Sequence, residues 1–124
     1  MYDQFDNRDL RKKTNFKTEF AHLKTGEILK SSIPLSGKFW VEGLETGDRC
    51  DVNMHIIRYA DAILMYAEAL NEVGKSTKAL AMLNRIRERA FGDDSGNFKP
   101  MSKDEVRTAI LNERRLEFPH EGHR

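Results

Sequence analysis

The chain has 124 residues, and one third of them are charged, with 21 basic and 20 acidic side chains and a formal net charge of +1. This length suits one domain with a modest core, and the charge balance gives no electrostatic case for nucleic-acid binding. The single cysteine, Cys50, excludes an intrachain disulfide and a multi-cysteine metal site, and no apolar run reaches the roughly 18 residues of a membrane span.

Residues 1–55 predict an irregular segment with short strands, because they show neither a sustained helical period nor a long alternation of apolar and polar residues. Phe16 and Phe20 lie four residues apart, and this spacing fits one face of a short helix. The segment 25–27 predicts a turn. The glycine-bounded run 37–43 is rich in strand formers and predicts a short strand.

Several oxygen-bearing side chains lie near the N-terminus among basic residues, and they are Asp3, Asp6, Asn7 and Asp9. Their density suggests calcium, but the spacing differs from the twelve-residue calcium loop and the glycine of its sharp turn is missing. We therefore interpret this stretch as a solvated turn with local hydrogen bonds.

Trp40 is the only tryptophan of the chain. A flat, exposed indole suits stacking on a sugar ring, whereas a lone aromatic residue in a strand also suits core or edge packing. Both interpretations stay open, and Trp40 is the one candidate for contact with a ligand.

Residues 56–73 predict a helix that is apolar nearly all round. The exception is a narrow polar row on one line of the helix, and it consists of Arg58, Asp61, Glu68 and Glu72. We expect this row to face neighbouring elements. Such a helix requires cover on several sides, which is more than one helical hairpin supplies.

A second helix is predicted to follow a tight break at 74–76, with Ser76 or Thr77 as a capping residue and an apolar stripe that continues to Ala90. Its last turns carry basic residues, namely Arg85, Arg87 and Arg89. We interpret these cations as a complement to the negative end of the helix, in preference to nucleic-acid contacts. Gly92 is well placed to end the helix.

A third helix is predicted from Lys103 to about Phe118, because Ser102 and Glu105 form a capping-box pattern at its start and Pro119 ends it. Glu113 falls on the apolar line of this helix. A carboxylate there requires a partner if it is buried, and the candidates are Arg114, Arg115 and Arg58.

The tail contains His120 and His123 beside two acids, but the two histidines do not follow the helical zinc-binding pattern, and Pro119 prevents the helix from continuing. We expect no metal and no cofactor. The sequence also contains no glycine-rich phosphate loop, and nothing in it indicates a catalytic triad or an acid–base pair. We therefore expect a protein that is not an enzyme.

Small residues at Ala67, Gly74 and Ala79 fit the tetratricopeptide helix–turn–helix pattern, in which two helices approach closely. Solenoids of such units generally need about three or more repeats, so one hairpin is incomplete. A tetratricopeptide-type module for protein–protein interaction is the alternative function.

Four motifs occur in a fixed order after Ile56: RYADAILMYAEALNE from Arg58, NRIRERA from Asn84, ILNERRLEF from Ile110 and EGHR from Glu121. Together they resemble the C-terminal core of the SusD/RagB family of outer-membrane nutrient-binding lipoproteins of Bacteroidetes. Upstream, DNRDLR from Asp6 and GKFW from Gly37 resemble the segment that precedes this core more weakly.

The resemblance implies a mainly α fold, with a tetratricopeptide-like hairpin and a third helix that belong to a larger SusD-like body. On this basis residues 56–124 form one incomplete helical core that follows the irregular segment 1–55. The implied function is the binding of a nutrient, an oligosaccharide above all, at the surface of the outer membrane. The implied partner is a SusC-like, TonB-dependent transporter barrel that receives the ligand without bond cleavage.

Family members are several times longer and begin with a lipoprotein signal peptide and an acylated cysteine, so we expect this chain to be a fragment. The matched motifs are framework in the family, and no ligand-binding residue is transferred. We expect ion-pair and hydrogen-bond roles that hold helices together for seven residues: Arg58, Glu68, Glu113, Arg114, Arg115, Glu121 and Arg124.

Overall fold

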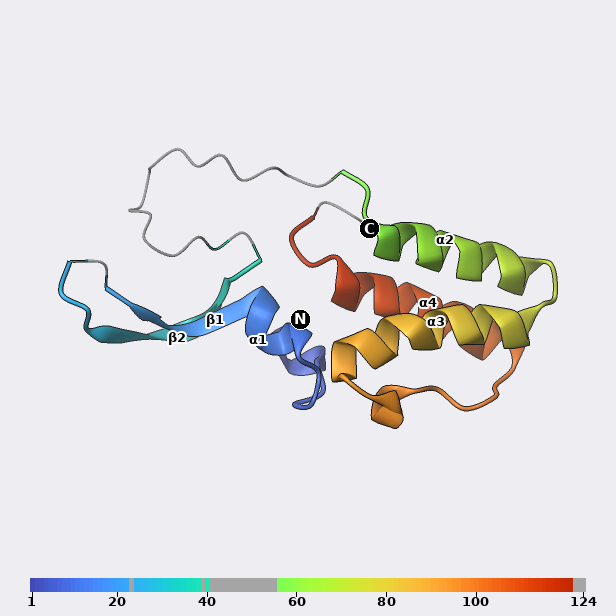
Figure 1. Cartoon of the computed structure of the whole chain (residues 1–124), viewed down its shortest axis with the longest axis horizontal. Coiled ribbons are helices and arrows are strands. Elements are labelled where there is room, and N and C mark those ends of the chain that lie inside the picture. The colour runs from blue at the N-terminus through green and yellow to red at the C-terminus, as the bar shows by residue number, and fades with distance from the viewer. Residues whose placement is uncertain (23, 39, 41–55, 122–124) are drawn as a thin grey trace.

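The computed structural model describes residues 1–22, 24–38, 40 and 56–121. In these residues the fold is mainly helical, with one two-stranded antiparallel sheet. Figure 1 shows a helical unit of α2, α3 and α4 at one end and the sheet at the other, with α1 between them. This arrangement confirms the expected mainly α class with short strands. The predicted boundary at residues 55 and 56 adjoins the segment 41–55, which lies outside the described residues, and it stays a prediction.

The helical hairpin consists of α2 (Tyr59–Glu72) and α3 (Ser76–Phe91). Gly74 makes the break possible because its φ of 78° lies in the left-handed region that residues with a side chain rarely adopt. The expected hydroxyl cap of α3 is wrong. The Ser76 hydroxyl donates to Asn71 Oδ1 at 2.7 Å, and no side chain caps the start of the helix. Gly92, with φ of 80°, ends α3 as predicted.

Helix α4 (Lys103–Glu117) begins at the predicted residue. Its capping box is confirmed: the Ser102 hydroxyl accepts from the Glu105 N–H at 3.4 Å, and the Glu105 carboxylate accepts from the Ser102 N–H at 2.8 Å. Helix α4 packs on both α2 and α3. The three helices share one apolar core, whose fully buried side chains include Leu64, Leu83 and Ile110.

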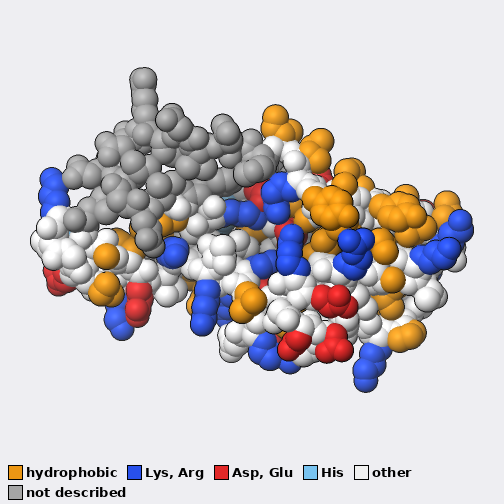
Figure 2. All heavy atoms as spheres, viewed as in Figure 1, with side chains coloured by type: hydrophobic (Ala, Val, Ile, Leu, Met, Phe, Trp, Pro, Cys, Tyr) orange, Lys and Arg blue, Asp and Glu red, His pale blue; other side chains and the backbone are white. Residues whose placement is uncertain are grey.

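One face of α2 remains exposed, although the sequence predicts a helix that requires cover on several sides. Tyr59, Tyr66 and the C-cap residue Val73 are spaced seven residues apart on one exposed line beside the core-facing side, and Tyr66 is 56% exposed. Hydrophobic side chains gather over α2 in Figure 2. The hairpin and α4 therefore cover only part of the apolar surface of this helix.

The N-terminal part contains the short helices η1 (Tyr2–Gln4) and α1 (Arg11–Asn15), followed by β1 (Phe16–Ala21) and β2 (Ile28–Ser36). A further short helix, η2 (Asp94–Gly96), follows α3. The strands are antiparallel, with Phe16 opposite Ser36 and Ala21 opposite Ile28. The predicted turn is confirmed, because Gly26 has φ of 70° and its N–H donates to the carbonyl of His22.

One local prediction for this part is wrong, and a second is not met at the residues that the structure describes. The helical face expected for Phe16 and Phe20 is wrong, because both residues lie in β1, where residues four apart also share a face. In the run 37–43, Gly37, Lys38 and Trp40 lie beyond the end of β2 and are not in a strand. The other residues of that run lie outside the described part of the chain.

Candidate functional site

Three carboxylates at the end of α4 form the centre of the main polar site. Glu113 and Glu117 are one helical turn apart on the buried face of α4, and Glu121 lies in the turn that begins at Pro119. Their side chains are at most 3% exposed. Buried carboxylates are stable as anions only when cations and hydrogen bonds surround them.

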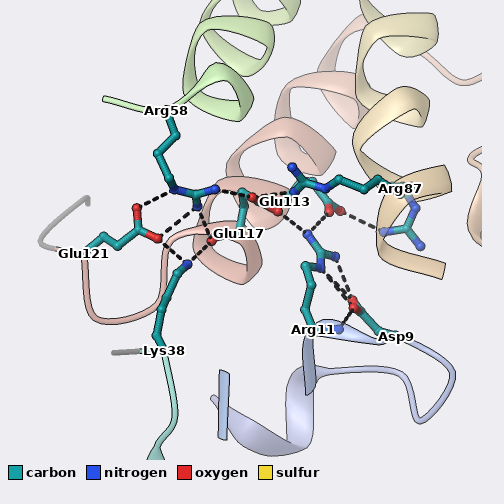
Figure 3. A network of polar contacts seen from close by, with 9 residues as sticks. Asp9, Arg11, Lys38, Arg58, Arg87, Glu113, Glu117 and Glu121 are labelled. Carbon is teal, nitrogen blue, oxygen red and sulfur yellow. Dashed lines mark hydrogen bonds and ion pairs between the residues drawn. The ribbon is translucent and has the colours of Figure 1, made fainter. Parts of the chain in front are cut away.

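The cations come from several separate elements, as Figure 3 shows. Together with the carboxylates they form the ion-pair cluster, which consists of Asp9, Arg11, Lys38, Arg58, Arg87, Arg89, Glu113, Glu117 and Glu121. Residues that are up to 106 positions apart in sequence, Arg11 and Glu117, therefore meet at the end of α4.

Arg11, at the start of α1, connects the N-terminal part to α4. Its Nη1 lies 2.7 Å from Glu113 Oε1 and donates a hydrogen bond of 2.9 Å to Glu117 Oε2. Its Nε and Nη2 donate to the two oxygens of Asp9 at 3.0 and 2.7 Å. This two-point pairing fixes the plane of the guanidinium group. Because Asp9 is buried, the solvated turn predicted for this stretch is wrong at that residue, whereas Asp3 and Asp6 are exposed.

Arg58, the residue before α2, connects that helix to the end of α4. It donates to Glu117 Oε1 at 3.0 Å and to the two oxygens of Glu121 at 2.9 Å each. Its Nη2 also donates to the main-chain carbonyl of Glu117 at 3.0 Å. Lys38 donates to the same carbonyl at 2.6 Å and forms an ion pair with Glu121.

Helix α3 supplies two further arginines. Arg87 Nη1 donates to Glu113 Oε2 at 2.8 Å, and Arg89 Nη2 donates to Glu117 Oε1 at 2.6 Å. The sequence indicates these arginines only as a complement to the helix dipole. Their contacts show that they also bind the carboxylates of a second helix.

The cluster shifts the pKa values of its members. Burial alone would raise the pKa of Glu117, but the hydrogen bonds and positive charges of Arg89 and Arg11 outweigh it and hold that pKa below the ordinary 4.5. Burial also acts to raise the pKa of Glu121. The hydrogen bonds and positive charges of Arg58 and Lys38 outweigh this effect, so the pKa of Glu121 is lowered as well. Burial lowers the pKa of Lys38 despite its contact with Glu121.

The residues predicted to hold helices together lie in different surroundings. Arg58, Glu113 and Glu121 meet in the cluster, and Arg114 pairs separately with Asp61 of α2 at 2.7 Å. Glu68 and Arg115 are exposed, and neither pairs with another residue of the described ranges. Arg124 lies outside the described residues. A framework role for the set as a whole stays a prediction.

The partners expected for Glu113 are wrong. Arg11 and Arg87 pair with it, in place of Arg114, Arg115 or Arg58. Arg114 follows Glu113 directly, so it is rotated by about 100° around the helix and points toward α2. Arg58 binds one turn further along, at Glu117.

The polar row of α2 faces its neighbours at three of four positions. Besides Arg58 and Asp61, Glu72 at the far end of the helix forms a two-point pair with Arg107 of α4, at 2.8 and 2.9 Å. This pair is half exposed and contributes little to stability compared with the buried cluster. Glu68, between Asp61 and Glu72, is the exposed exception.

Sequence reasoning missed six members of the cluster: Asp9, Arg11, Lys38, Arg87, Arg89 and Glu117. Arg11 and Lys38 come from the irregular segment, where no periodic pattern indicates which side chains are buried. Glu117 carried a usable signal, because it lies four residues after Glu113 and shares its face of the helix.

Trp40 is 39% exposed, and its ring centroid lies 5.5 Å from that of Phe20 in a tilted arrangement. Part of the indole is therefore packed against β1 while part is open to solvent. Both interpretations of Trp40 remain compatible with this placement.

The arrangement as a whole pairs charges and joins elements. Each carboxylate of the cluster contacts at least one cation. None of these four carboxylates is therefore an unpaired group with space beside it for a substrate whose proton it would accept. Within the described ranges no group of three or more His, Cys, Asp or Glu residues is arranged to hold a metal ion. In those same ranges no helix is long and apolar enough to cross a membrane.

The described residues thus form a mainly helical fold in which an arginine–glutamate cluster lies at the junction of several elements. The profile of the SusD family matches residues 32–124, which include α2, α3, α4 and the last five residues of β2. The chain belongs to the SusD family.

Three curated relatives, all from Formosa agariphila, support this assignment. SusD-like protein P38 is 42% identical over 80 residues, which cover 60% of this chain and 16% of the relative. SusD-like protein P2 is 32% identical over 143 aligned residues, which cover 98% of this chain and 28% of the relative. SusD-like protein P25 is 32% identical over 96 residues, which cover 75% of this chain and 18% of the relative. The chain thus spans at most 28% of the length of these relatives. No solved structure matches.

Proposed function

We propose that this chain is part of a SusD-like protein that binds an oligosaccharide at the surface of the outer membrane. The protein passes the ligand to a SusC-like, TonB-dependent transporter barrel and does not cleave it. The observation that carries this proposal is the match of the SusD family profile to residues 32–124. The alignment with SusD-like protein P2, which covers 98% of the chain, adds support.

In this proposal the described residues supply framework. This is supported by Arg58, Glu113 and Glu121, which belong to the family motifs and bind other side chains of the same chain in the buried cluster. Trp40 is the one residue proposed for contact with the sugar, because its indole is partly open to solvent. Stacking of an aromatic ring on a sugar needs such an accessible face.

The proposal is tested by expressing the gene that encodes this chain in its own host with an affinity tag. Isothermal titration calorimetry against a panel of oligosaccharides should show binding of at least one of them, with no shortening of the sugar. An outer-membrane β-barrel should co-purify. If no member of the panel binds and no barrel co-purifies, the proposed function is wrong.

Trp40→Ala tests the proposed contact separately, with Tyr66→Ala on the exposed face of α2 as the matched aromatic control. Loss of a stacking contact of about 1 kcal/mol should weaken binding roughly fivefold. The control should bind like the wild type. Equal affinities of both variants would refute the role of Trp40. They would not refute the proposed function, which the oligosaccharide panel tests on the unaltered protein.

A tetratricopeptide-type interaction module is the second candidate. The exposed apolar line of α2, with Tyr59 and Tyr66, favours it, because such lines bind apolar partner segments. Under this alternative the tagged protein would bind no oligosaccharide and would co-purify with a protein other than a transporter barrel. Tyr66→Ala, and not Trp40→Ala, would then reduce the binding.

A further inference from the structure

The N-terminal part and the helical unit have separate apolar clusters. The core of the helical unit contains residues of α2, α3 and α4 together with Phe118, and no residue before Ala60 belongs to it in the described ranges. In the N-terminal part, Phe16 makes edge-to-face contacts with Tyr2 and Phe5, at centroid distances of 5.5 and 5.6 Å. Burial of apolar surface therefore stabilises each part mainly within itself.

Charged groups make most of the polar contacts between the two parts. Arg11 contacts Glu113 and Glu117, and Lys38 contacts Glu121 and the Glu117 carbonyl. One backbone hydrogen bond joins the N–H of Leu10 to the carbonyl of Ala90, at 2.8 Å. Two ring contacts add to these, between Phe16 and His120 and between Arg8 and Phe91.

The helical unit does not require these N-terminal cations for its own charge pairing. Glu113 keeps Arg87 as a partner when Arg11 is absent. Glu117 keeps Arg58 and Arg89, and Glu121 keeps Arg58 when Lys38 is absent. Removal of Arg11 and Lys38 therefore still leaves a paired cation at each of these three carboxylates.

We propose that the ion-pair cluster is a releasable attachment: loss of the charge attraction at Arg11 and Lys38 frees the N-terminal part from the helical unit, while α2, α3 and α4 remain folded.

Acid should cause this release. Arg11 from α1, Arg58 beside α2 and Arg89 from α3 face the Glu117 carboxylate, Lys38 contacts its carbonyl, and Glu113 and His120 lie on its own segment. Protonation of the carboxylates removes the attraction and leaves five mutually repelling cations in one place, namely Arg11, Lys38, Arg58, Arg87 and Arg89. Of these, only Arg11 and Lys38 belong to the part that can move away.

The direction of the pH effect follows from the lowered pKa values of Glu117 and Glu121. A carboxylate whose folded-state pKa is depressed stabilises the folded contact above its ordinary pKa of 4.5, and this contribution is lost as the pH falls through the folded-state pKa. Salt should have a small effect, because the Arg11 side chain is only 11% exposed and buried pairs are weakly screened.

Hydrogen exchange of the full 124-residue chain at neutral pH tests the attachment directly. In the double variant Arg11→Met/Lys38→Met, peptides from 9–38 should lose protection by about 100-fold, the effect of breaking a buried ion pair. Peptides from α2, α3 and α4 should stay within about threefold of the wild type. Arg8→Met is the matched control, because Arg8 pairs with Asp6 at the exposed surface, and it should change neither set.

An acid titration of the wild type supplies a second, independent readout. Trp40, the only tryptophan, reports on the N-terminal part by fluorescence, and far-ultraviolet circular dichroism reports on the helices. The Trp40 transition should precede helix loss on acidification and should occur at the same pH in 0.05 and 0.5 M salt. Loss of protection throughout the double variant, unchanged protection in peptides from 9–38, or coincident acid transitions would overturn the proposal.

Discussion

Substitution of Glu113 by glutamine provides the sharpest test of the energetic role of the cluster. The Glu113 side chain is 1% exposed and contacts Arg11 and Arg87. The amide keeps the size of the carboxylate but removes its charge, so two largely buried guanidinium groups lose a counter-charge. Removal of one partner from a buried ion pair costs about 3–5 kcal/mol, because the other charge remains buried and unpaired.

We take about 3 kcal/mol as the expected loss for Glu113→Gln, because Arg11 keeps Asp9 and Glu117 as partners. For a chain of this length, each kcal/mol lowers the melting temperature by about 4 °C. The expected decrease is therefore about 12 °C. Thermal unfolding followed by circular dichroism at neutral pH measures it, and urea unfolding measures the change in free energy.

Glu68→Gln is the matched control, because Glu68 is an exposed glutamate of α2 without an ion-pair partner in the described ranges. Its free energy of unfolding should change by less than about 0.5 kcal/mol. If Glu113→Gln were as stable as this control, the reasoning that the cluster stabilises the fold would be refuted.

Further predictions concern the helices and the response to pH. Ser102→Ala removes the hydroxyl that accepts from the Glu105 N–H and should cost about 1 kcal/mol in urea unfolding, and an unchanged midpoint would contradict the capping role. Leu83→Ala leaves a cavity at a fully buried position and should cost about 3 kcal/mol, whereas a cost below 1 kcal/mol would show that the site is loosely packed. The free energy of unfolding should fall as the pH decreases below 4.5, because Glu117 and Glu121 have lowered pKa values in the folded chain, and a rise in stability over that range would reverse the assigned sign.

The helices were predictable because their signals are local. The Ser102–Glu105 capping box fixed the start of α4, and Gly74 and Gly92 marked the break before α3 and its end. The N-terminal strands were harder to predict. Phe16 and Phe20 are four residues apart, and this spacing places side chains on one face in a helix and in a strand alike. Pairing of β1 with β2, which is not local, decides between the two.

The composition of the ion-pair cluster could be predicted only in part. Burial of Glu113 followed from its place on the apolar line of the helix, and so did its need for a cation. The identity of that cation did not follow, because Arg11 lies about 100 residues earlier in a segment without periodicity. The sequence offered nearer arginines, but Arg114 points toward Asp61 of α2.

The central claim is that the family motifs at the end of α4 build a framework and that the nutrient binds elsewhere. Glu117→Gln, introduced into the protein expressed from its own gene, tests this claim when unfolding and affinity for the best oligosaccharide of the panel are measured on the same sample. The account predicts a loss of about 3 kcal/mol in the free energy of unfolding, with unchanged affinity at a temperature where the variant is folded. Unchanged stability together with a tenfold or greater loss of affinity would contradict it.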